Sequence, residues 1–417
     1  MKPLANFLTG ILIFTFVLAA VNIQPALADS DNDKVRVMIE YKPGQKRAVE
    51  TAAKRAGAVI HYDFDNLNTL ALTLPAAALD GISRNPNVVS VEEDAIRYMI
   101  GTSLPRFDLN QAISAAGDPF TEQVVPYGID MVQARDVWDS NRDGVVDTGA
   151  PTGAGFTICI IDSGINKDHV DLSGVNMLGG YPTGWDSDLF GHGTHVAGTI
   201  AAMNNSLGVV GVTPGTVSLY FIKVFGDDGA WSYSSTLMDA ANRCAAAGAD
   251  IISMSLGGTR SNRQERITFD NLYAAGILSV AAASNEGTTA YSYPASYDSV
   301  VSVAAIDESM QWADFSNFND QVELAAPGVG VLSTVPYLES NTLVVDGTTY
   351  AAQHIEFAAR GTATGTLAHG GLCGTVGAWT GQVVLCERGT QDFYTKVMNV
   401  QNGGGVAAVI YNNAPGN

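Results

Sequence analysis

Three short segments place an acid, an imidazole and an amide close to strand-like runs of the sequence. Asp162 directly follows the apolar run at residues 157–161 and precedes a turn-forming glycine. His192 opens a helical pattern of small residues, and Asn285 follows the apolar run at residues 277–281. A histidine at the start of a helix can act as a base, and a side-chain amide can donate a hydrogen bond to a developing oxyanion.

Each segment taken alone has a simpler interpretation. Asp162 could cap an Asx-turn, and Asn285 could be an ordinary turn residue. His192 and His195 could bind zinc, although no glutamate base or third ligand accompanies them, or both could be structural. The small residues after His192 favour a helix that packs closely against a neighbour.

The elements that must position these residues predict an α/β fold over residues 123–339. Strands that are buried on both faces and separated by helices are typical of a doubly wound, mainly parallel sheet. Such a sheet places its chemistry at the carboxyl ends of the strands. The expected strands are residues 157–161, 218–224, 251–254, 277–281 and 300–304, and the expected helices are residues 194–203, 236–247 and 261–275.

Smaller regions flank this sheet. Residues 34–98 combine strand-like and helical runs in the β-α-β-β-α-β order of a small ferredoxin-like α+β domain. Residues 99–122 show little periodicity and predict a linker. Residues 340–417 are rich in Gly, Thr and Val, with short strand-like runs and one helical pattern near residues 394–401.

Composition narrows the classes of protein. The chain has 417 residues, of which 46% are hydrophobic and 15% charged, and its formal net charge is −20. The apolar fraction excludes global disorder. Because a nucleic-acid binder needs a basic face to neutralise phosphates, the acidic balance predicts that nucleic acid is not a partner.

The first residues predict a secretory signal peptide at residues 1–28. Lys2 precedes an apolar run at residues 7–21, and Ala26 and Ala28 are the small residues that a signal peptidase reads. A membrane anchor is the alternative, but a membrane span needs about 20 apolar residues. We therefore expect a soluble, secreted protein with no membrane partner, in a compartment that permits disulfides.

Taken together and in this order, the segments around Asp162, His192 and Asn285 resemble those of the subtilisin-like serine proteases. The resemblance covers about residues 123–335. It implies that Asp162 orients His192, that His192 is the general base, and that Asn285 donates to the oxyanion. It also implies that residues 34–98 are the family's propeptide, an intramolecular inhibitor. The expected partners are protein or peptide substrates and the chain's own propeptide.

The resemblance extends to segments that hold the substrate in this family. Ser255, Leu256 and Gly257 resemble the family's substrate-binding edge strand, whose backbone pairs with an extended peptide. Residues 226–233, with Gly229 among them, resemble the opposite edge, where Trp231 replaces the small residue usual in the family. Glu286 would stand at the mouth of an otherwise apolar first pocket.

The family's nucleophile is not found in its motif. Subtilisin-like proteases carry the serine in Gly-Thr-Ser-Met-Ala, whereas the last serine of this sequence is Ser340. Thr349, in Gly-Thr-Thr-Tyr-Ala, is the nearest similar position, but its extra methyl group would crowd a tightly packed turn. Residues 340–417 instead resemble the start of a protease-associated (PA) domain, often inserted before the nucleophile. We therefore expect the serine beyond Asn417 and an inactive, truncated precursor.

Two groups of oxygen-bearing residues predict bound Ca²⁺. The first group matches the front half of an EF-hand loop, with a solvated acidic turn as the alternative. It comprises Asp139, Asn141, Asp143 and Asp147. The resemblance implies a second site at Gln123, Asp171, Met203, Asn205, Leu207 and Val209, where some ligands are backbone carbonyls. Calcium bound there would stabilise the native state by mass action.

The cysteines predict one disulfide. Cys373 and Cys386 flank an expected hairpin in an exported domain, and we expect them to be bonded. Cys159 and Cys244, in a buried strand and a helix, are expected to be free core thiols. A rival interpretation from another class is a non-catalytic secreted module that binds calcium or acts as an inhibitor through its propeptide-like region.

Overall fold

The structure is a computed structural model that describes residues 34–101, 122–227, 229–335, 342–351, 363–389 and 391–411. The predicted signal peptide and most of the predicted linker lie outside the described residues. The chain divides into two compact units, Met1–Pro336 and Tyr337–Asn417. Each unit has its own apolar core.

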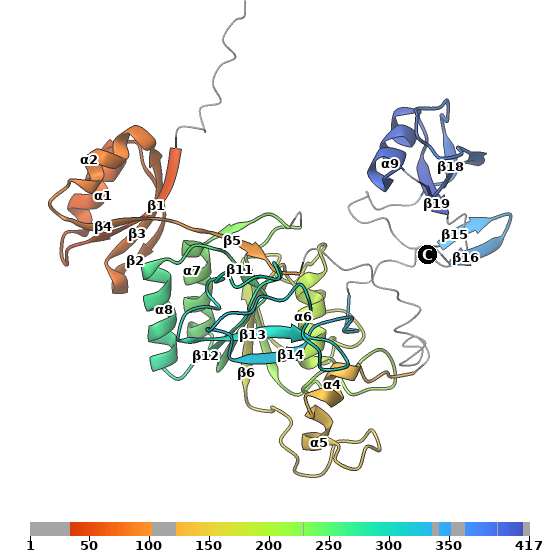
Figure 1. Ribbon diagram of the computed structural model, residues 1–417, viewed down its shortest axis with the longest axis horizontal. Coiled ribbons are helices and arrows are strands. Elements are labelled where there is room, and N and C mark those ends of the chain that lie inside the picture. The colour runs from red at the N-terminus through yellow and green to blue at the C-terminus, as the bar shows by residue number, and fades with distance from the viewer. Residues whose placement is uncertain are drawn as a thin grey trace, which may run out of the picture. The chain divides into compact units, whose positions relative to one another are not determined.

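The amino-terminal subdomain, residues 34–94, is a four-stranded antiparallel sheet with helices on one face (Figure 1). Alternate residues of one strand, including Val37 and Ile39, pack with Val49 of the first helix to form its core. The elements are β1 (Lys34–Tyr41), α1 (Lys46–Arg55), β2 (Val59–Phe64), β3 (Thr69–Pro75), α2 (Leu79–Ser83) and β4 (Val88–Glu93), with single 3-10 turns at Asp65–Leu67 and Ala76–Ala78. Their order is the one that the sequence predicts.

The opposite face of this small sheet packs on helix α7 (Ser234–Ala246). The apolar contact is formed by Met38, Phe64, Ala71 and Met238. Beside it, Asp94 Oδ1 accepts a hydrogen bond of 2.8 Å from the Ser235 amide in the first turn of α7, and Arg36 Nε donates to Asp94 at 2.7 Å. A carboxylate is favoured at a helix N-terminus. The subdomain is thus held by an apolar patch and by a helix cap.

A parallel sheet of seven strands lies at the centre of the first unit, in the order β14-β13-β12-β10-β6-β8-β7. This confirms the predicted α/β class. The strand order reverses beside β6, and parallel sheets bind ligands at such a reversal, outside the carboxyl ends of the strands. The strands are β6 (Thr157–Asp162), β7 (Asn176–Tyr181), β8 (Ser218–Lys223), β10 (Ile251–Met254), β12 (Leu278–Ala282), β13 (Val300–Ile306) and β14 (Leu324–Pro327).

Helices cover both faces of this sheet (Figure 1). Because successive residues of a strand point to opposite faces, Cys159 and Ile161 of β6 belong to one core cluster and Ile160 to the other. The first cluster includes residues of α7 and α8 (Arg263–Ala274), and the second includes residues of α6 (His192–Ala201). Two short helices, α4 (Tyr127–Met131) and α5 (Ala134–Trp138), precede β6.

Two strands of the large sheet were not expected from the sequence. β7 contains Gly179 and Gly180, and β14 contains two alanines and a proline. Neither has the β-branched residues that mark a strand by composition. Both lie at the sheet edges, where pairing with a single neighbour, β8 or β13, defines them.

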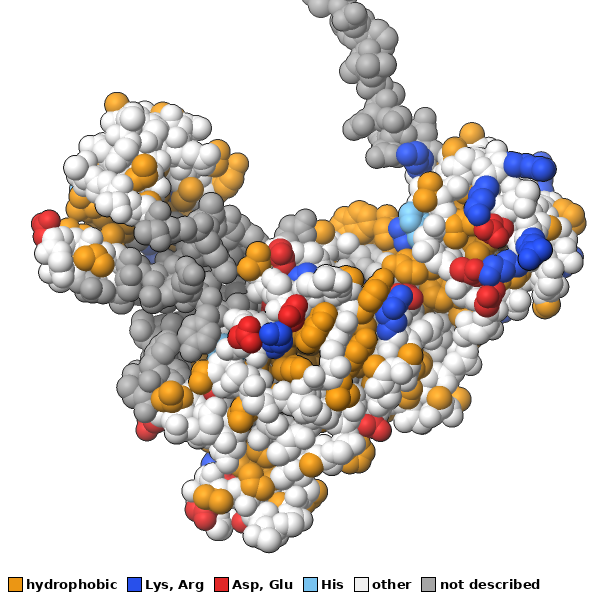
Figure 2. Space-filling model, turned by 180° about the vertical axis from the view of Figure 1, so that it is seen from behind, with side chains coloured by type: hydrophobic (Ala, Val, Ile, Leu, Met, Phe, Trp, Pro, Cys, Tyr) orange, Lys and Arg blue, Asp and Glu red, His pale blue; other side chains and the backbone are white. Residues whose placement is uncertain are grey.

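Charge is distributed unevenly over the first unit. Figure 2 shows Lys and Arg side chains gathered on the amino-terminal subdomain, on the face that is seen from behind. Basic and acidic residues balance within residues 34–94, so the net charge of −20 arises elsewhere in the chain. The subdomain therefore adds no net acidic charge to the acidic body on which it docks.

The second unit contains a hairpin and a parallel sheet. The hairpin is β15 (Thr342–Val345) with β16 (Thr348–Ala351). The sheet is β17 (Thr366–His369), β18 (Gln382–Glu387) and β19 (Ala407–Tyr411), beside helix α9 (Phe393–Asn402), which falls where the sequence predicts a helix. The side chain of Thr349 lies outside the described residues.

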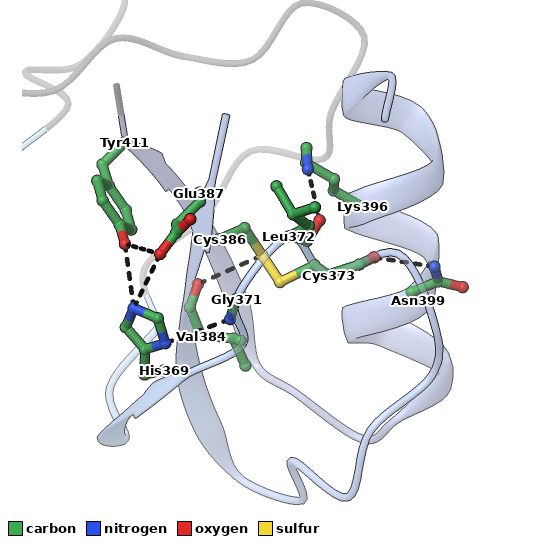
Figure 3. The surroundings of a disulfide bond; sticks show 10 residues. All are labelled: His369, Gly371, Leu372, Cys373, Val384, Cys386, Glu387, Lys396, Asn399 and Tyr411. Carbon is green, nitrogen blue, oxygen red and sulfur yellow. Dashed lines mark hydrogen bonds and ion pairs between the residues drawn. A yellow bond between two sulfur atoms is a disulfide. The ribbon is translucent and has the colours of Figure 1, made fainter. Parts of the chain in front are cut away.

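The predicted pair Cys373 and Cys386 is bonded (Figure 3). The expectation of a hairpin between these cysteines is wrong, because β17 and β18 run parallel and Cys373 lies in the connection between them. The same connection is tied to α9, since Lys396 Nζ donates to Leu372 O at 2.5 Å and Asn399 Nδ2 donates to Cys373 O at 2.9 Å. The connection between β17 and β18 is therefore tied to β18 by the disulfide and to α9 by two hydrogen bonds.

The structure corrects the prediction for Cys159 and Cys244, which are joined by a disulfide. Cys159 lies in β6 and Cys244 in α7, and their Cα atoms are 5.6 Å apart. That separation is typical of bridged cysteines. The two residues are 85 positions apart in sequence, so only the packing of α7 on the sheet brings them together.

In the described part of the chain, every helix falls short of the length or the apolar character that a membrane crossing requires.

Candidate active site

Asp162 and His192 meet at the carboxyl edge of the parallel sheet. Asp162 is the last residue of β6, and His192 is the first residue of α6. His192 Nδ1 donates to Asp162 Oδ1 at 2.7 Å, and the aspartate side chain is only 1% exposed. Oδ1 also accepts from the Ser163 amide at 2.7 Å, which fixes the carboxylate. The pair has the geometry in which a carboxylate holds one tautomer of an imidazole.

Close packing explains the small residues after His192. A Cβ atom at Gly193 would stand 2.1 Å from Gly164 O, so a side chain there would push α6 away from the end of β6. A move of that kind would separate His192 from Asp162. The glycine is therefore required by the approach of the two elements.

Burial and charge act in opposite directions on His192. Burial disfavours the imidazolium, but the adjacent Asp162 carboxylate outweighs it, and the pKa of His192 is raised above its ordinary value of 6.5. His195, one turn along α6, differs. Burial and the nearby His192 lower the pKa of His195 to about 4, so its ring is neutral at pH 7.

The second nitrogen of His192 faces the end of the amino-terminal region. Nε2 lies 3.0 Å from Ile100 O and donates to it when the ring is protonated. A Cβ atom at Gly101 would lie 3.3 Å from the same nitrogen. The peptide bond between Ile100 and Gly101 therefore lies next to Nε2 of the imidazole.

An extended tail, residues 95–101, leads from the subdomain to His192. Its strand β5 (Ile96–Met99) lies between β11 (Leu256–Gly257) and β9 (Ser232–Tyr233) in an antiparallel sheet of three strands. Figure 1 shows β5 beside β11, above the parallel sheet. The Ile100 amide donates to Ser255 O at 2.9 Å, which extends the pairing to the residue at the imidazole.

The predicted substrate-edge residues divide into two groups. Ser255, Leu256 and Gly257 pair with the tail through their backbones. On the other edge, Ser232 and Tyr233 pair with the tail, within the segment 226–233 that the sequence indicates, whereas Gly229 of that segment lies outside the printed pairing.

Gly229 packs closely on the Phe190 ring, because a Cβ atom added at Gly229 would stand 2.5 Å from that ring. Ser232 and Tyr233 lie at the end of the segment, residues 226–233, that resembles this edge in the sequence. Glu286 is exposed, and its amide donates to Asn317 Oδ1 at 3.0 Å.

Asn285 lies on the loop that follows β12. The preceding residue, Ser284, has φ of 99°, a conformation that non-glycine residues rarely adopt. Asn285 itself is exposed. β12 pairs with β10, and β10 pairs with β6, so this loop leaves the sheet at the same edge as Asp162.

Zinc chemistry is not supported by the two histidines. Both ring nitrogens of His192 are engaged, with Asp162 and with Ile100. His195 has a hydrogen bond with the backbone of Val331. Over the described ranges, no cluster of three or more His, Cys, Asp or Glu side chains is arranged to hold a metal.

The first predicted calcium group contains a buried oxygen without a partner. Asp139 is fully buried, and its Oδ1 accepts no hydrogen bond, whereas Oδ2 accepts weakly from Gly144 at 3.2 Å. Asp147 Oδ2 accepts from Ser140, and Asn141 Nδ2 donates to Asp143 at 3.0 Å. A buried carboxylate oxygen is stable only when paired, and a hard cation such as Ca²⁺ is one such partner.

The second predicted group forms one oxygen-rich cluster. Asp171, fully buried, accepts from the Val209 amide at 2.9 Å and from Asn205 Nδ2 at 3.1 Å. Gln123 Nε2 donates to Met203 O at 2.8 Å, and Asn205 Oδ1 accepts from the Leu207 amide at 2.8 Å. The structure thus brings together residues that come from three separate segments. Carboxylate, amide and carbonyl oxygens are the ligands that Ca²⁺ takes.

The α/β fold and the buried Asp–His pair at a strand reversal define a hydrolase-type site. The family model described as "Subtilase family" matches residues 153–360, and the model described as "PA domain" matches residues 340–417.

Curated relatives support the same assignment. Subtilisin J of Geobacillus stearothermophilus is 32% identical over 84% of this chain and 84% of its own length. Subtilisin DY of Bacillus licheniformis is 41% identical over 57% of this chain and 84% of its own length. A solved psychrophilic subtilisin-like protease of Pseudoalteromonas sp. AS-11 is 36% identical, covers 70% of this chain and 71% of that one, and has a TM-score of 0.47. The chain belongs to the subtilase family of serine-type endopeptidases and carries a PA domain.

Proposed function

We propose that this chain is the precursor of a secreted, calcium-stabilised subtilisin-like endopeptidase, held inactive by its own amino-terminal region. The observation that supports it best is the path of the tail. Residues 96–100 pair on both edges as an extended peptide substrate would, and Ile100 O faces His192 Nε2 at 3.0 Å. Recognition by strand addition uses backbone hydrogen bonds of this kind.

Each residue of the site has a proposed role in peptide hydrolysis. Asp162 keeps the Nδ1 proton of His192 in place, so that Nε2 can take the proton of an attacking serine hydroxyl. The amide of Asn285 donates to the oxyanion that forms at the peptide carbonyl. His192 then returns the proton to the leaving amine.

Among the residues that the structure describes, the two ring nitrogens of His192 bond to Asp162 and Ile100, and neither bonds to a serine. Ser333, on the stretch before the PA domain, donates instead to His195 O at 2.7 Å. The hydrolysis proposed here needs a serine hydroxyl within reach of His192 Nε2, the nitrogen that faces Ile100 O in the docked state. Loss of a nucleophile costs several orders of magnitude in rate.

The amino-terminal subdomain acts as the inhibitor in this proposal. Its tail occupies the substrate position, and the Ile100–Gly101 peptide bond lies where the scissile bond would lie. Release of the tail frees both edges, β9 and β11, for a substrate.

Calcium is proposed at both oxygen-rich groups, as a structural ion. Asp139 at the first group has a buried oxygen that lacks a partner, and Asp171 at the second lies within a cluster of oxygens. An ion at the second group would order the loop after α6, and an ion at either group would stabilise the native state by mass action. Secretion is consistent with the two disulfides, because bonded cysteines persist in oxidising compartments.

The test is labelling of the full-length secreted protein with a serine-reactive fluorophosphonate, together with hydrolysis of a denatured protein substrate. We expect labelling after release of the tail and none in a His192→Ala variant. A protein that remains unlabelled and inactive after release of its tail would refute the proposal.

A further inference from the structure

An arginine and a glutamate form a fully buried ion pair between the tail and the catalytic body. Arg97 of β5 and Glu265 of α8 both have side chains that are 0% exposed. Arg97 Nε donates to Glu265 Oε1 at 2.9 Å, and Arg97 Nη2 donates to Oε2. Two parallel hydrogen bonds of this kind match the planar guanidinium to the carboxylate.

The register assigns Arg97 a definite place in the substrate path. Ile100 O faces His192, so the residue before the scissile bond is Ile100, and Arg97 is the fourth residue before that bond. Side chains alternate along the tail. Arg97 and Met99 are buried, whereas Tyr98 between them is 54% exposed. The fourth residue of an extended peptide bound in this register therefore points into the protein.

Glu265 is held in place by groups of the catalytic body. Tyr297 donates from its hydroxyl to Glu265 Oε2 at 2.7 Å. The Glu265 amide lies in the first turn of α8 and donates to Asn262 Oδ1 at 3.1 Å. The hydroxyl oxygen of Tyr297 in turn accepts from the Asn262 amide at 2.9 Å. These contacts to Glu265 come from residues of the catalytic body and not from the tail, although the Asn262 side chain also donates to Glu93 O of the subdomain at 3.0 Å.

A carboxylate in such a site discriminates strongly between side chains. A leucine or alanine in the pocket would cover Glu265 without pairing it, and a buried unpaired charge is costly. A lysine supplies charge but only a point contact, whereas the guanidinium fills both carboxylate oxygens. The pocket is therefore shaped for one side chain.

We propose that Glu265 makes the mature protease select substrates with arginine at the fourth residue before the cleaved bond. This inference rests on the proposed function, and it adds a specificity that a general broad-specificity protease lacks. An alternative role for the ion pair is purely structural, in which it only holds the tail on α8. Only the first role predicts that the protease hydrolyses peptides with arginine at the fourth residue faster than peptides with another residue there.

The experiment compares hydrolysis of a peptide series by the full-length secreted protein after release of its tail. The peptides carry isoleucine before the cleaved bond, as the tail does, and differ only at the fourth residue: arginine, lysine, leucine, or citrulline, which is the neutral isostere of arginine. We expect kcat/KM for arginine to exceed that for citrulline or leucine by roughly 30-fold or more, which corresponds to the lower end of the cost of unpairing a buried charge.

Variants identify the group responsible. Glu265→Gln should reduce the ratio of arginine to citrulline to near one, and Asp270→Asn, on the exposed side of the same helix, should leave it unchanged. Equal kcat/KM values for arginine and citrulline in the unsubstituted protein would overturn the proposal without any variant. A preference that survives Glu265→Gln would overturn it as well. If none of the peptides is cleaved, the result would instead overturn the proposed function.

Discussion

Protonation of His192 should control how firmly the tail is held. In the docked state both ring nitrogens face acceptors, Asp162 Oδ1 at 2.7 Å and Ile100 O at 3.0 Å. Only the imidazolium can donate to both. Because the pKa of His192 is raised in the folded state, its stabilising contribution is complete below pH 6.5 and is lost as the pH rises through the raised pKa.

The size of the effect follows from one hydrogen bond. A bond from a charged donor contributes about 1.5–3 kcal/mol. Loss of that bond should raise the population of undocked tail by roughly 10- to 150-fold. The assay is hydrogen exchange at the Ile100 and Gly101 amides of this polypeptide between pH 6 and pH 9, corrected for the intrinsic pH dependence of exchange.

Asp162→Asn provides the matched control. It removes the charge that raises the pKa of His192 while burial still lowers it, so the transition should move below pH 6.5. Protection that is flat across the range, or that increases with pH, would refute the reasoning.

Three further outcomes are expected. Replacing Cys159 and Cys244 together by alanine should lower the free energy of unfolding by about 2–4 kcal/mol in urea titrations, because the bridge closes a long loop, and an unchanged midpoint would contradict this. Chelation of calcium should lower the Tm. The Asp171→Asn variant should show a smaller drop in Tm on chelation, whereas the variant of an exposed aspartate, Asp168→Asn, should show the full drop. Equal drops in the two variants would exclude Asp171 as a ligand. Asp94→Ala should remove the capping of α7 at a cost of about 1–2 kcal/mol, measured as faster proteolysis between subdomain and body, and proteolysis at the unsubstituted rate would count against the cap.

The sequence determined the fold class and the approximate positions of the chemistry. Buried parallel strands are continuous apolar runs, and each strand end is punctuated by polar or turn-forming residues. For that reason Asp162, at the end of β6, and His192, at the start of α6, could be placed before any coordinates. The predicted helix in the second unit was similarly readable, since α9 has a helical period.

The tertiary structure alone decided which distant residues meet. Arg97 and Glu265 are 168 positions apart, and Cys159 and Cys244 are 85 apart. Local pattern carries no information on such pairs, because they depend on how strands and helices pack. The exact pairing residues of β9 within the indicated segment 226–233 have the same cause, because a strand of two residues exists only through its pairing with the tail. The local sequence therefore specified most helices and strands, whereas pairing between distant segments specified the register in which β9 and β11 hold the tail.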